Sequence, residues 1–233
     1  MKKSFLGRRY MQVRLGERYG KKTPVYIEGE LLGNVYPNEI DIYHLEDDGE
    51  IDEQDYTRLK EETLIPRAKR YVMNLLVKSD KTETELRRKL DQAGYGDEIS
   101  EAAIDYVKGF HYIDELRTAA AFIRTKIDSS SEKEIRFKLS EKGINDDTAD
   151  LAFQQISEEL EAAKDPDEDS FEISDNPELK AAQNFVRKKL GSKLSSMDEL
   201  SYEERQKLMA AAYRKGFKHE SIREALRLLG IDD

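Results

Sequence analysis

The sequence repeats one helical pattern three times, and this repetition constrains the fold more than any other feature. In each copy, apolar side chains occur at offsets of 0, 3, 4 and 8, which together form one face of an α-helix. The positions are Ala68, Tyr71, Val72 and Leu76; Ala119, Phe122, Ile123 and Ile127; and Ala182, Phe185, Val186 and Leu190. We interpret each set as the buried face of the first helix of a repeat.

A second helix follows in each copy, with signals for its beginning and its end. A Ser/Thr-x-x-Glu capping box precedes it, because such a pair satisfies two free amide groups at a helix start. The boxes are Thr82 with Glu85, Ser131 with Glu134, and Ser201 with Glu204. A glycine then stands where a left-handed residue ends a helix. We therefore predict helix ends at Gly94, Gly143 and Gly216.

A third helix is predicted after each glycine, beginning near Asp97, Asp146 and His219. The predicted fold class is mainly α, with three tandem three-helix repeats in an elongated curved array behind a small N-terminal β element. The predicted boundaries are residues 65–113 for the first repeat, 114–164 for the second and 178–233 for the third.

Strand-like patterns occur only near the N-terminus, in residues 1–50. Tyr10–Leu15 alternates, and Val25–Ile27 followed by Glu28-Gly29 and a second apolar run is typical of a β-hairpin. Residues 51–64 are interpreted as a connecting helix, which Asp52 caps.

An acidic stretch at residues 165–177 separates the second repeat from the third. It contains Pro166 and Pro177, and we interpret it as a solvated linker that lets the third repeat move. Pro177 can occupy the first position of the next helix, where its missing amide proton costs nothing.

The residues that catalysis or metal binding would require are missing. The chain has no cysteine, and its three histidines, at positions 44, 111 and 219, form no His-x-x-x-His pair. Gly191-Ser192-Lys193 lacks the earlier glycine of a phosphate loop. We expect no catalytic residue, metal site or cofactor. No apolar run approaches the roughly 20 residues of a membrane span, so we expect a protein of the cytoplasm without membrane contact. We also expect it to be a monomer.

Basic clusters are the best candidates for a binding surface, although the net charge is -10. The run from Leu179 to Met197 contains no acidic residue, which favours a functional role for its cations. In helix 82–93 the cations are better explained as part of a solvent-exposed helix face than as a binding surface. Glutamates precede them by four residues or fewer and can pair with them. The candidate residues are Arg187, Lys188, Lys189 and Lys193; Arg214, Lys215 and Lys218; and Arg87 and Arg88.

Taken together, these pieces resemble the RecX family, regulators of the RecA recombinase. The resemblance rests on the β segment at residues 25–30, the run Thr82–Leu90, the connector Gly109–Asp114 and the helix ends Leu139–Gly143 and Arg214–Phe217. It implies a protein without enzyme activity that binds the RecA filament on single-stranded DNA and restrains its ATPase, strand-exchange and coprotease activities. The basic clusters would then contact the filament or DNA.

Two other functions stay open at this point. A direct DNA-binding protein of helix-turn-helix type would bind single- or double-stranded DNA, but it needs basic or amide side chains at the start of a recognition helix. The third helices begin with acidic or mixed residues. A scaffold protein is the other alternative. Tyr71, Phe122 and Phe185 could stack on bases, yet their position on the apolar faces favours core packing.

Overall fold

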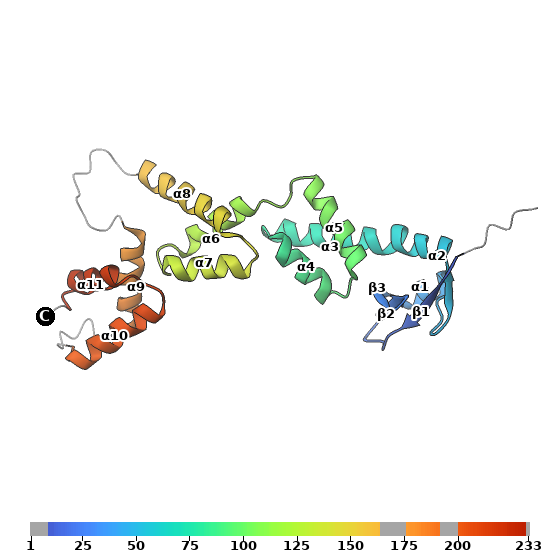
Figure 1. Cartoon of the computed structure of the whole chain (residues 1–233), viewed down its shortest axis with the longest axis horizontal. Coiled ribbons are helices and arrows are strands. Elements are labelled where there is room, and N and C mark those ends of the chain that lie inside the picture. Colours follow the sequence, from blue (N-terminus) through green and yellow to red (C-terminus); the bar gives the residue numbers. More distant parts are fainter. Residues whose placement is uncertain (1–8, 164–175, 192–199, 232–233) are drawn as a thin grey trace, which may run out of the picture. The chain divides into compact units, whose positions relative to one another are not determined.

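The computed structural model describes residues 9–163, 176–191 and 200–231 (Figure 1). Most of the predicted acidic linker lies outside these residues, and so does Lys193, one of the candidate binding residues. The chain divides into two compact units, residues 1–114 and 115–233. The fold is mainly helical with a small antiparallel sheet at its N-terminal end, as the sequence predicts.

Four strands form the sheet, in the order β3-β2-β1-β4. They are β1 (Tyr10–Leu15), β2 (Thr23–Ile27), β3 (Glu30–Val35) and β4 (Glu50–Asp52). The predicted hairpin is confirmed, because Ile27 pairs with Glu30 across a turn whose residues, Glu28 and Gly29, both have positive φ, 52° and 86°. A short helix, α1 (Pro37–Ile42), follows β3 and was not expected from the sequence.

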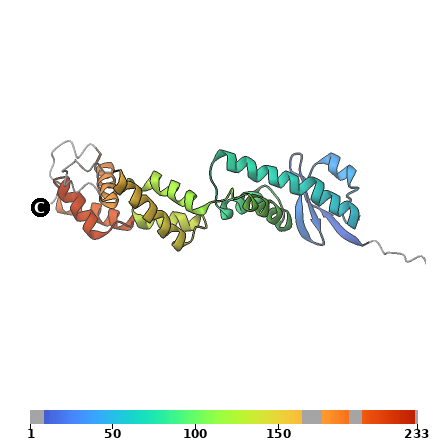
Figure 2. The same cartoon turned by 90° about the horizontal axis from the view of Figure 1, so that it is seen from above.

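One continuous helix follows the sheet and lies across it, as Figure 2 shows. It consists of α2 (Glu53–Arg58), the π-helical stretch η1 (Leu59–Leu64) and α3 (Ile65–Lys78). Asp52 caps it as predicted, since its side chain accepts a hydrogen bond from the amide of Asp55 at 2.8 Å. The helix that we predicted over residues 51–64 is thus present, and it continues without a break into the first helix of the first repeat. The wide π turn, in which the Ile65 amide donates to Lys60, lets the chain continue through Pro66, which has no amide proton to donate.

In the part of the chain that the structure describes, nine helices form the three predicted triplets. They are α3, α4 (Glu83–Gln92) and α5 (Asp97–Gly109); α6 (Glu115–Lys126), α7 (Glu132–Glu141) and α8 (Asp146–Ala162); and α9 (Pro177–Leu190), α10 (Tyr202–Arg214) and α11 (His219–Leu228). Within the described ranges, the chain beyond Ile65 has no strand. None of these helices is long and apolar enough to cross a membrane.

The predicted helix ends are confirmed in all three repeats. Gly94, Gly143 and Gly216 have φ of 79°, 82° and 91°, which is the left-handed region where glycine avoids the steric cost of a Cβ. After each glycine, the next amide reaches back to a carbonyl five residues earlier, as from Tyr95 to Leu90 at 3.1 Å. This hydrogen bond closes the helix end that the sequence indicates.

The first repeat shares one hydrophobic core with the sheet. The turn between α4 and α5 lies directly on β3, where the Gly96 amide donates to the Leu32 carbonyl at 3.1 Å. A Cβ at Gly96 would lie 1.7 Å from the Leu31 carbonyl oxygen, so only glycine permits this approach. The side chain of Asn34 also donates to the Ala93 carbonyl at 3.0 Å.

The second and third repeats have separate cores but contact one another within their unit. The Ser131 hydroxyl, which is fully buried, donates to the Lys215 carbonyl at 2.6 Å. The Lys180 ammonium lies 3.1 Å from the Asp128 carboxylate, and the Asn184 side chain donates to the Asp128 carbonyl at 2.8 Å. The third repeat therefore contacts the second in this structure, and its motion relative to the second stays a prediction.

Candidate partner-binding surface

The basic run of α9 lies on the exposed part of its last turn. Arg187, Lys188 and Lys189 are all exposed, whereas Val186 on the same turn is fully buried. The buried face anchors the helix, because Phe185 packs against the core with its ring 5.6 Å from that of Phe217. Cations near a helix C-terminus are also favoured by the helix dipole. The run is therefore a fixed basic surface that bulk solvent reaches.

Within residues 9–163, 176–191 and 200–231, no ion pair involves Arg187, Lys188 or Lys189. The Lys189 ammonium lies 5.9 Å from the centre of the Phe185 ring. A cation that is not paired within the chain can attract an external phosphate or carboxylate. The structure places the predicted candidates together, except for Lys193, which lies outside the described residues.

The second candidate cluster, at the α10–α11 turn, serves the protein's own packing in part. Arg214 is exposed on the last turn of α10. The Lys215 ammonium, however, lies 3.4 Å from the Glu134 carboxylate, and the Lys218 ammonium lies 3.6 Å from that of Glu178. The predicted capping box at Ser131 is only half formed. The Ser131 hydroxyl accepts from the Glu134 amide, but the Glu134 carboxylate pairs with Lys138 and Lys215. Although burial alone would raise it, Lys138 and Lys215 hold the pKa of Glu134 below its usual value.

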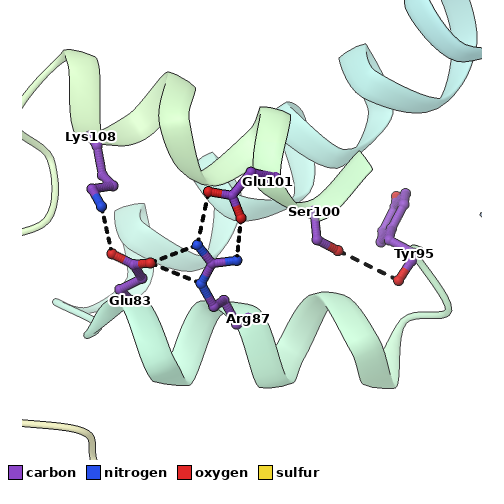
Figure 3. Close-up of polar contacts among 6 residues, drawn as sticks. All are labelled: Glu83, Arg87, Tyr95, Ser100, Glu101 and Lys108. Carbon is purple, nitrogen blue, oxygen red and sulfur yellow. Dashed lines mark hydrogen bonds and ion pairs between the residues drawn. The ribbon is translucent and has the colours of Figure 1, made fainter. Parts of the chain in front are cut away.

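The third candidate cluster, on α4, contains an internal ion pair network. Figure 3 shows the Arg87 guanidinium between two carboxylates, with hydrogen bonds of 2.8 Å to Glu83 and of 2.7 and 3.1 Å to Glu101 of α5. Lys108 donates to the other oxygen of Glu83 at 2.9 Å. Hydrogen bonds from Lys108 and Arg87 lower the pKa of Glu83, and Arg87 lowers that of Glu101. Arg88 is exposed on the same helix.

The same network recurs in the second repeat, at the equivalent positions. Arg136 of α7 donates to Glu132 at 2.8 Å and to Asp150 of α8 at 2.6 Å. An arrangement that occurs twice at one place in a repeated fold is part of the repeat's architecture. The role of Arg87 in this structure is to join α4 to α5, and a role in partner binding stays a prediction for Arg87 and Arg88.

A cluster of exposed aromatic rings is a further candidate that the sequence analysis missed. Tyr106 and Phe110 lie edge to face with their centres 5.0 Å apart, and Phe110 stacks on Tyr112 at 5.7 Å. Phe110 is 55% exposed. The positive φ of His111, 55°, turns the chain so that Tyr112 reaches the helix end. The sequence did contain a signal for this cluster, because aromatic residues follow one another at intervals of four and two positions around the end of α5.

The other aromatic candidates are core residues, as the sequence favours. Tyr71, Phe122 and Phe185 each pack against the core of their own repeat. In the described segments, no three acidic or histidine side chains are grouped closely enough to hold a metal ion. The three histidines are separate, with His219 at the first position of α11.

The geometry defines the class of protein: three copies of a three-helix domain with a basic surface on the last copy. Comparison with known proteins shows the same class. The model of the first three-helix domain of RecX matches residues 68–106, and that of the third three-helix domain matches residues 176–226.

Several similar proteins carry the name regulatory protein RecX. One from Clostridium botulinum (strain Eklund 17B / Type B) is 27% identical over 63% of this chain and 61% of its own length, and one from Clostridium acetobutylicum is 28% identical over 58% and 64%. These alignments thus span less than two thirds of either relative. One from Clostridioides difficile (strain 630) is 21% identical over 93% of this chain and 94% of its own.

A crystal structure of a regulatory protein RecX has the same fold. Its TM-score is 0.55 at 18% identity, covering 95% of this chain and all of the other. The domain matches, the relatives and the fold agree with the resemblance seen in the sequence. The chain's first and third three-helix domains match those of the RecX family.

Proposed function

We propose that this protein is a regulator without enzyme activity that binds the RecA filament on single-stranded DNA and inhibits its ATPase, strand-exchange and coprotease activities. It would act as a monomer in the cytoplasm. The observation that carries the proposal is the exposed basic turn of α9, in a chain whose relatives are regulatory proteins. A RecA filament on DNA offers both acidic protein surface and phosphates to such cations.

The contact would work mainly through charge. Arg187 and Lys188 can form charge-assisted hydrogen bonds with phosphate or carboxylate oxygens, which are about twice as strong as neutral ones. Binding that releases counterions weakens as salt rises. A ligand that binds one filament state better than another shifts the filament toward that state. Inhibition would follow if this state hydrolyses ATP slowly.

Direct DNA binding without RecA is the rival function. The third helices begin with Asp97-Glu98, Asp146-Asp147 and His219-Glu220. Carboxylates at these positions repel phosphates, which counts against a recognition helix. The rival predicts that the protein binds DNA equally well when RecA is absent.

The test is a charge reversal of the basic turn, with Arg187→Glu, Lys188→Glu and Lys189→Glu combined. Binding of the protein to single-stranded DNA is measured by filter retention with and without RecA and a nonhydrolysable ATP analogue. We expect the triple variant to bind the filament at least about tenfold more weakly, with a smaller salt dependence. A folded triple variant that still suppressed RecA ATP hydrolysis at wild-type concentrations would exclude this surface.

A matched control separates this surface from the change in net charge. Arg70, Lys78 and Lys207 are also exposed and belong to none of the candidate clusters. Reversing these three to glutamate changes the net charge equally. We expect this variant to retain inhibition within about twofold, since isolated surface charges contribute little. Far-UV circular dichroism of both variants checks that the helices are intact.

A further inference from the structure

A pocket lies where the third repeat contacts the second, within the unit of residues 115–233. Its volume is about 610 Å³, in the middle of the range of ligand pockets. One wall is a single face of α8, on which Phe153, Ser157 and Leu160 follow one another at helical spacing. The first turns of α7, α9 and α11 supply most of the other walls.

Most of the floor of this pocket is apolar. Ile135 and Leu179 are buried, and Ile127 and Phe153 are half-buried. Leu160, on the α8 wall, is 43% exposed. An exposed leucine beside half-buried apolar side chains is surface whose removal from water is favourable. The pocket therefore suits a large apolar side chain.

The charged side chains of the pocket are four glutamates and one lysine. Three of the glutamates form ion pairs within the chain. These pairs are Glu132 with Arg136, Glu178 with Lys218, and Glu224 with Arg227. The fourth, Glu220, is exposed, and its side chain has no ion pair or hydrogen bond to any residue that the structure describes. One negative charge at the edge of the apolar floor is thus left without a cation.

The helix starts around the pocket do not cancel this charge. Glu132, Glu178 and Glu220 lie in the first turns of their helices, where a carboxylate stabilises the helix. A helix start carries about half a positive charge, whereas each carboxylate carries a full negative one. The pocket therefore repels the phosphates of a nucleic acid and attracts a cation. The acidic stretch at residues 165–177 has the same sign of charge as the rim, which counts against it as the occupant.

The chain already binds one cation at this wall. The Arg136 guanidinium lies 4.7 Å from the centre of the Phe153 ring and donates to the Glu132 carboxylate at 2.8 Å. Both the ring and the carboxylate line the pocket. An aromatic face beside a carboxylate is a favourable place for a guanidinium, because both attract its charge.

We propose that this pocket binds a basic peptide segment of a partner protein, with a lysine or arginine at Glu220 and a neighbouring large apolar side chain against Phe153 and Leu160. A charge-assisted hydrogen bond is about twice as strong as a neutral one. The aliphatic stem of a lysine or arginine can lie on the apolar floor while its charged end reaches Glu220. The segment would contact α8 and α11 together and hold the third repeat against the second.

This site uses other residues than the basic turn of α9 and does not rest on the RecA proposal. Its test uses the full chain alone, with a displayed library of random nine-residue peptides as the probe. We expect enrichment of sequences with a lysine or arginine close to a large apolar residue. The best enriched peptide is then labelled and titrated by fluorescence anisotropy.

Two matched pairs of variants separate the pocket from the net charge of -10, which attracts any basic peptide. Glu220→Gln should weaken binding at least about fivefold, whereas Glu203→Gln, which changes the net charge equally at an exposed position outside the pocket, should change it less than about twofold. Leu160→Ala should also weaken binding about fivefold. Leu151→Ala, at an exposed position of the same helix outside the pocket, should change it less than about twofold.

The same contact can be tested from the side of the peptide. Norleucine in place of the peptide's basic residue should weaken binding to the wild type about fivefold and should have less effect on binding to Glu220→Gln, because the two groups act as a pair. Far-UV circular dichroism checks that the helices of each variant are intact.

Three results would overturn the proposal. One is a library without enriched sequences, and another is enrichment of sequences that lack basic residues. The third is an equal loss of binding in Glu220→Gln and Glu203→Gln, which would show that the peptide follows the net charge of the chain rather than the pocket.

Discussion

The first and third repeats have the same three-helix scaffold but differ in the side chains that they expose to solvent. Both bury the same helical face, and both end their second helix at a left-handed glycine. At the seam, which is the contact between the second and third helices, two corresponding positions aligned on the shared leucine and glycine of each repeat have opposite charge: Glu83 and Glu101 in the first, Arg205 and Arg223 in the third. Core positions are fixed by packing, because even one methylene matters there. Seam positions are half-exposed and are free to differ in charge.

The two repeats also use the turn after the second helix differently. In the first, Gly94 and Gly96 bring the turn onto β3. In the third, Gly216 brings it onto the start of α7, where an added Cβ would lie 2.8 Å from the Ser131 hydroxyl. The same local device therefore joins a repeat to a sheet in one unit and to another repeat in the other unit.

The largest effect should come from Gly96→Ala in the first repeat. The added Cβ meets the backbone of β3, which cannot yield as a side chain would. We expect the free energy of unfolding to fall by about 3 kcal/mol, the upper part of the range for overpacking. Urea unfolding followed by far-UV circular dichroism measures it.

Gly109→Ala is the control for this effect. It adds the same methyl group at the end of α5, where nothing lies within 4 Å. We expect no loss of stability there, and a gain of up to about 1 kcal/mol, since alanine is the better helix former. Equal stability of the two variants would show that the turn does not need to touch β3.

The second effect concerns the contact between the second and third repeats. Ser131→Ala removes the acceptor for the Glu134 amide and the donor to the Lys215 carbonyl, and both of these hydrogen bonds are part-buried. We expect a loss of about 2 kcal/mol, because a cap contributes about 0.5 to 2 and the lost hydrogen bond to Lys215 adds to it. Urea unfolding at pH 7 is again the measurement.

Ser201→Ala tests whether this loss is more than a lost cap. Ser201 forms a full capping box with Glu204 but is exposed. We expect about 1 kcal/mol for its loss. If both serine variants lost the same stability, the hydrogen bond to Lys215 would contribute nothing to the contact between the repeats.

The helices could be predicted from the sequence because their signals are local. Thr82 and Gly94 mark the two ends of α4 within thirteen residues, and each acts through the backbone of its own helix. The strand β1 was likewise predictable from alternation alone. The merging of residues 53–78 into one helix was not, because it depends on a π turn that no residue type specifies.

The candidate surface was only partly predictable for a related reason. The exposure of Arg187 to Lys189 follows from helical periodicity, which the sequence contains. The ion pair of Arg87 with Glu101 joins residues on different helices, so it requires the tertiary packing of α4 on α5. The opposite charges at the seam of the third repeat became visible only when that packing showed which positions to compare.

The third effect tests the seam network itself. Arg87→Met gives the first repeat the residue that the third has at this position, Met209, and leaves two carboxylates facing each other. We expect a loss of about 1 kcal/mol, since half-exposed ion pairs contribute about 0.2 to 1 each. Stability of Arg87→Met equal to that of the wild type would show that this network does not join α4 to α5.

The smallest effect is the pH dependence of the seam. Hydrogen bonds from Lys108 and Arg87 hold the pKa of Glu83 below its ordinary value of 4.5. Its contribution is therefore fully present above about pH 4.5 and is lost as the pH falls through the lower, folded pKa. We expect Glu83→Gln to cost about 0.5 kcal/mol at pH 7 and less at pH 3, by urea unfolding.

Glu203→Gln in the third repeat is the control. The Glu203 side chain is 83% exposed, and its carboxylate lies 3.9 Å from the Lys207 ammonium. A distant, exposed pair gains almost nothing from the charged form, so we expect the stability of this variant to match the wild type within about 0.3 kcal/mol at both pH values. If Glu83→Gln behaved in the same way, the carboxylates would not hold the seam of the first repeat together. The charges between the second and third helices would then not stabilise the first repeat, and the different charges of the third repeat would have no consequence for stability.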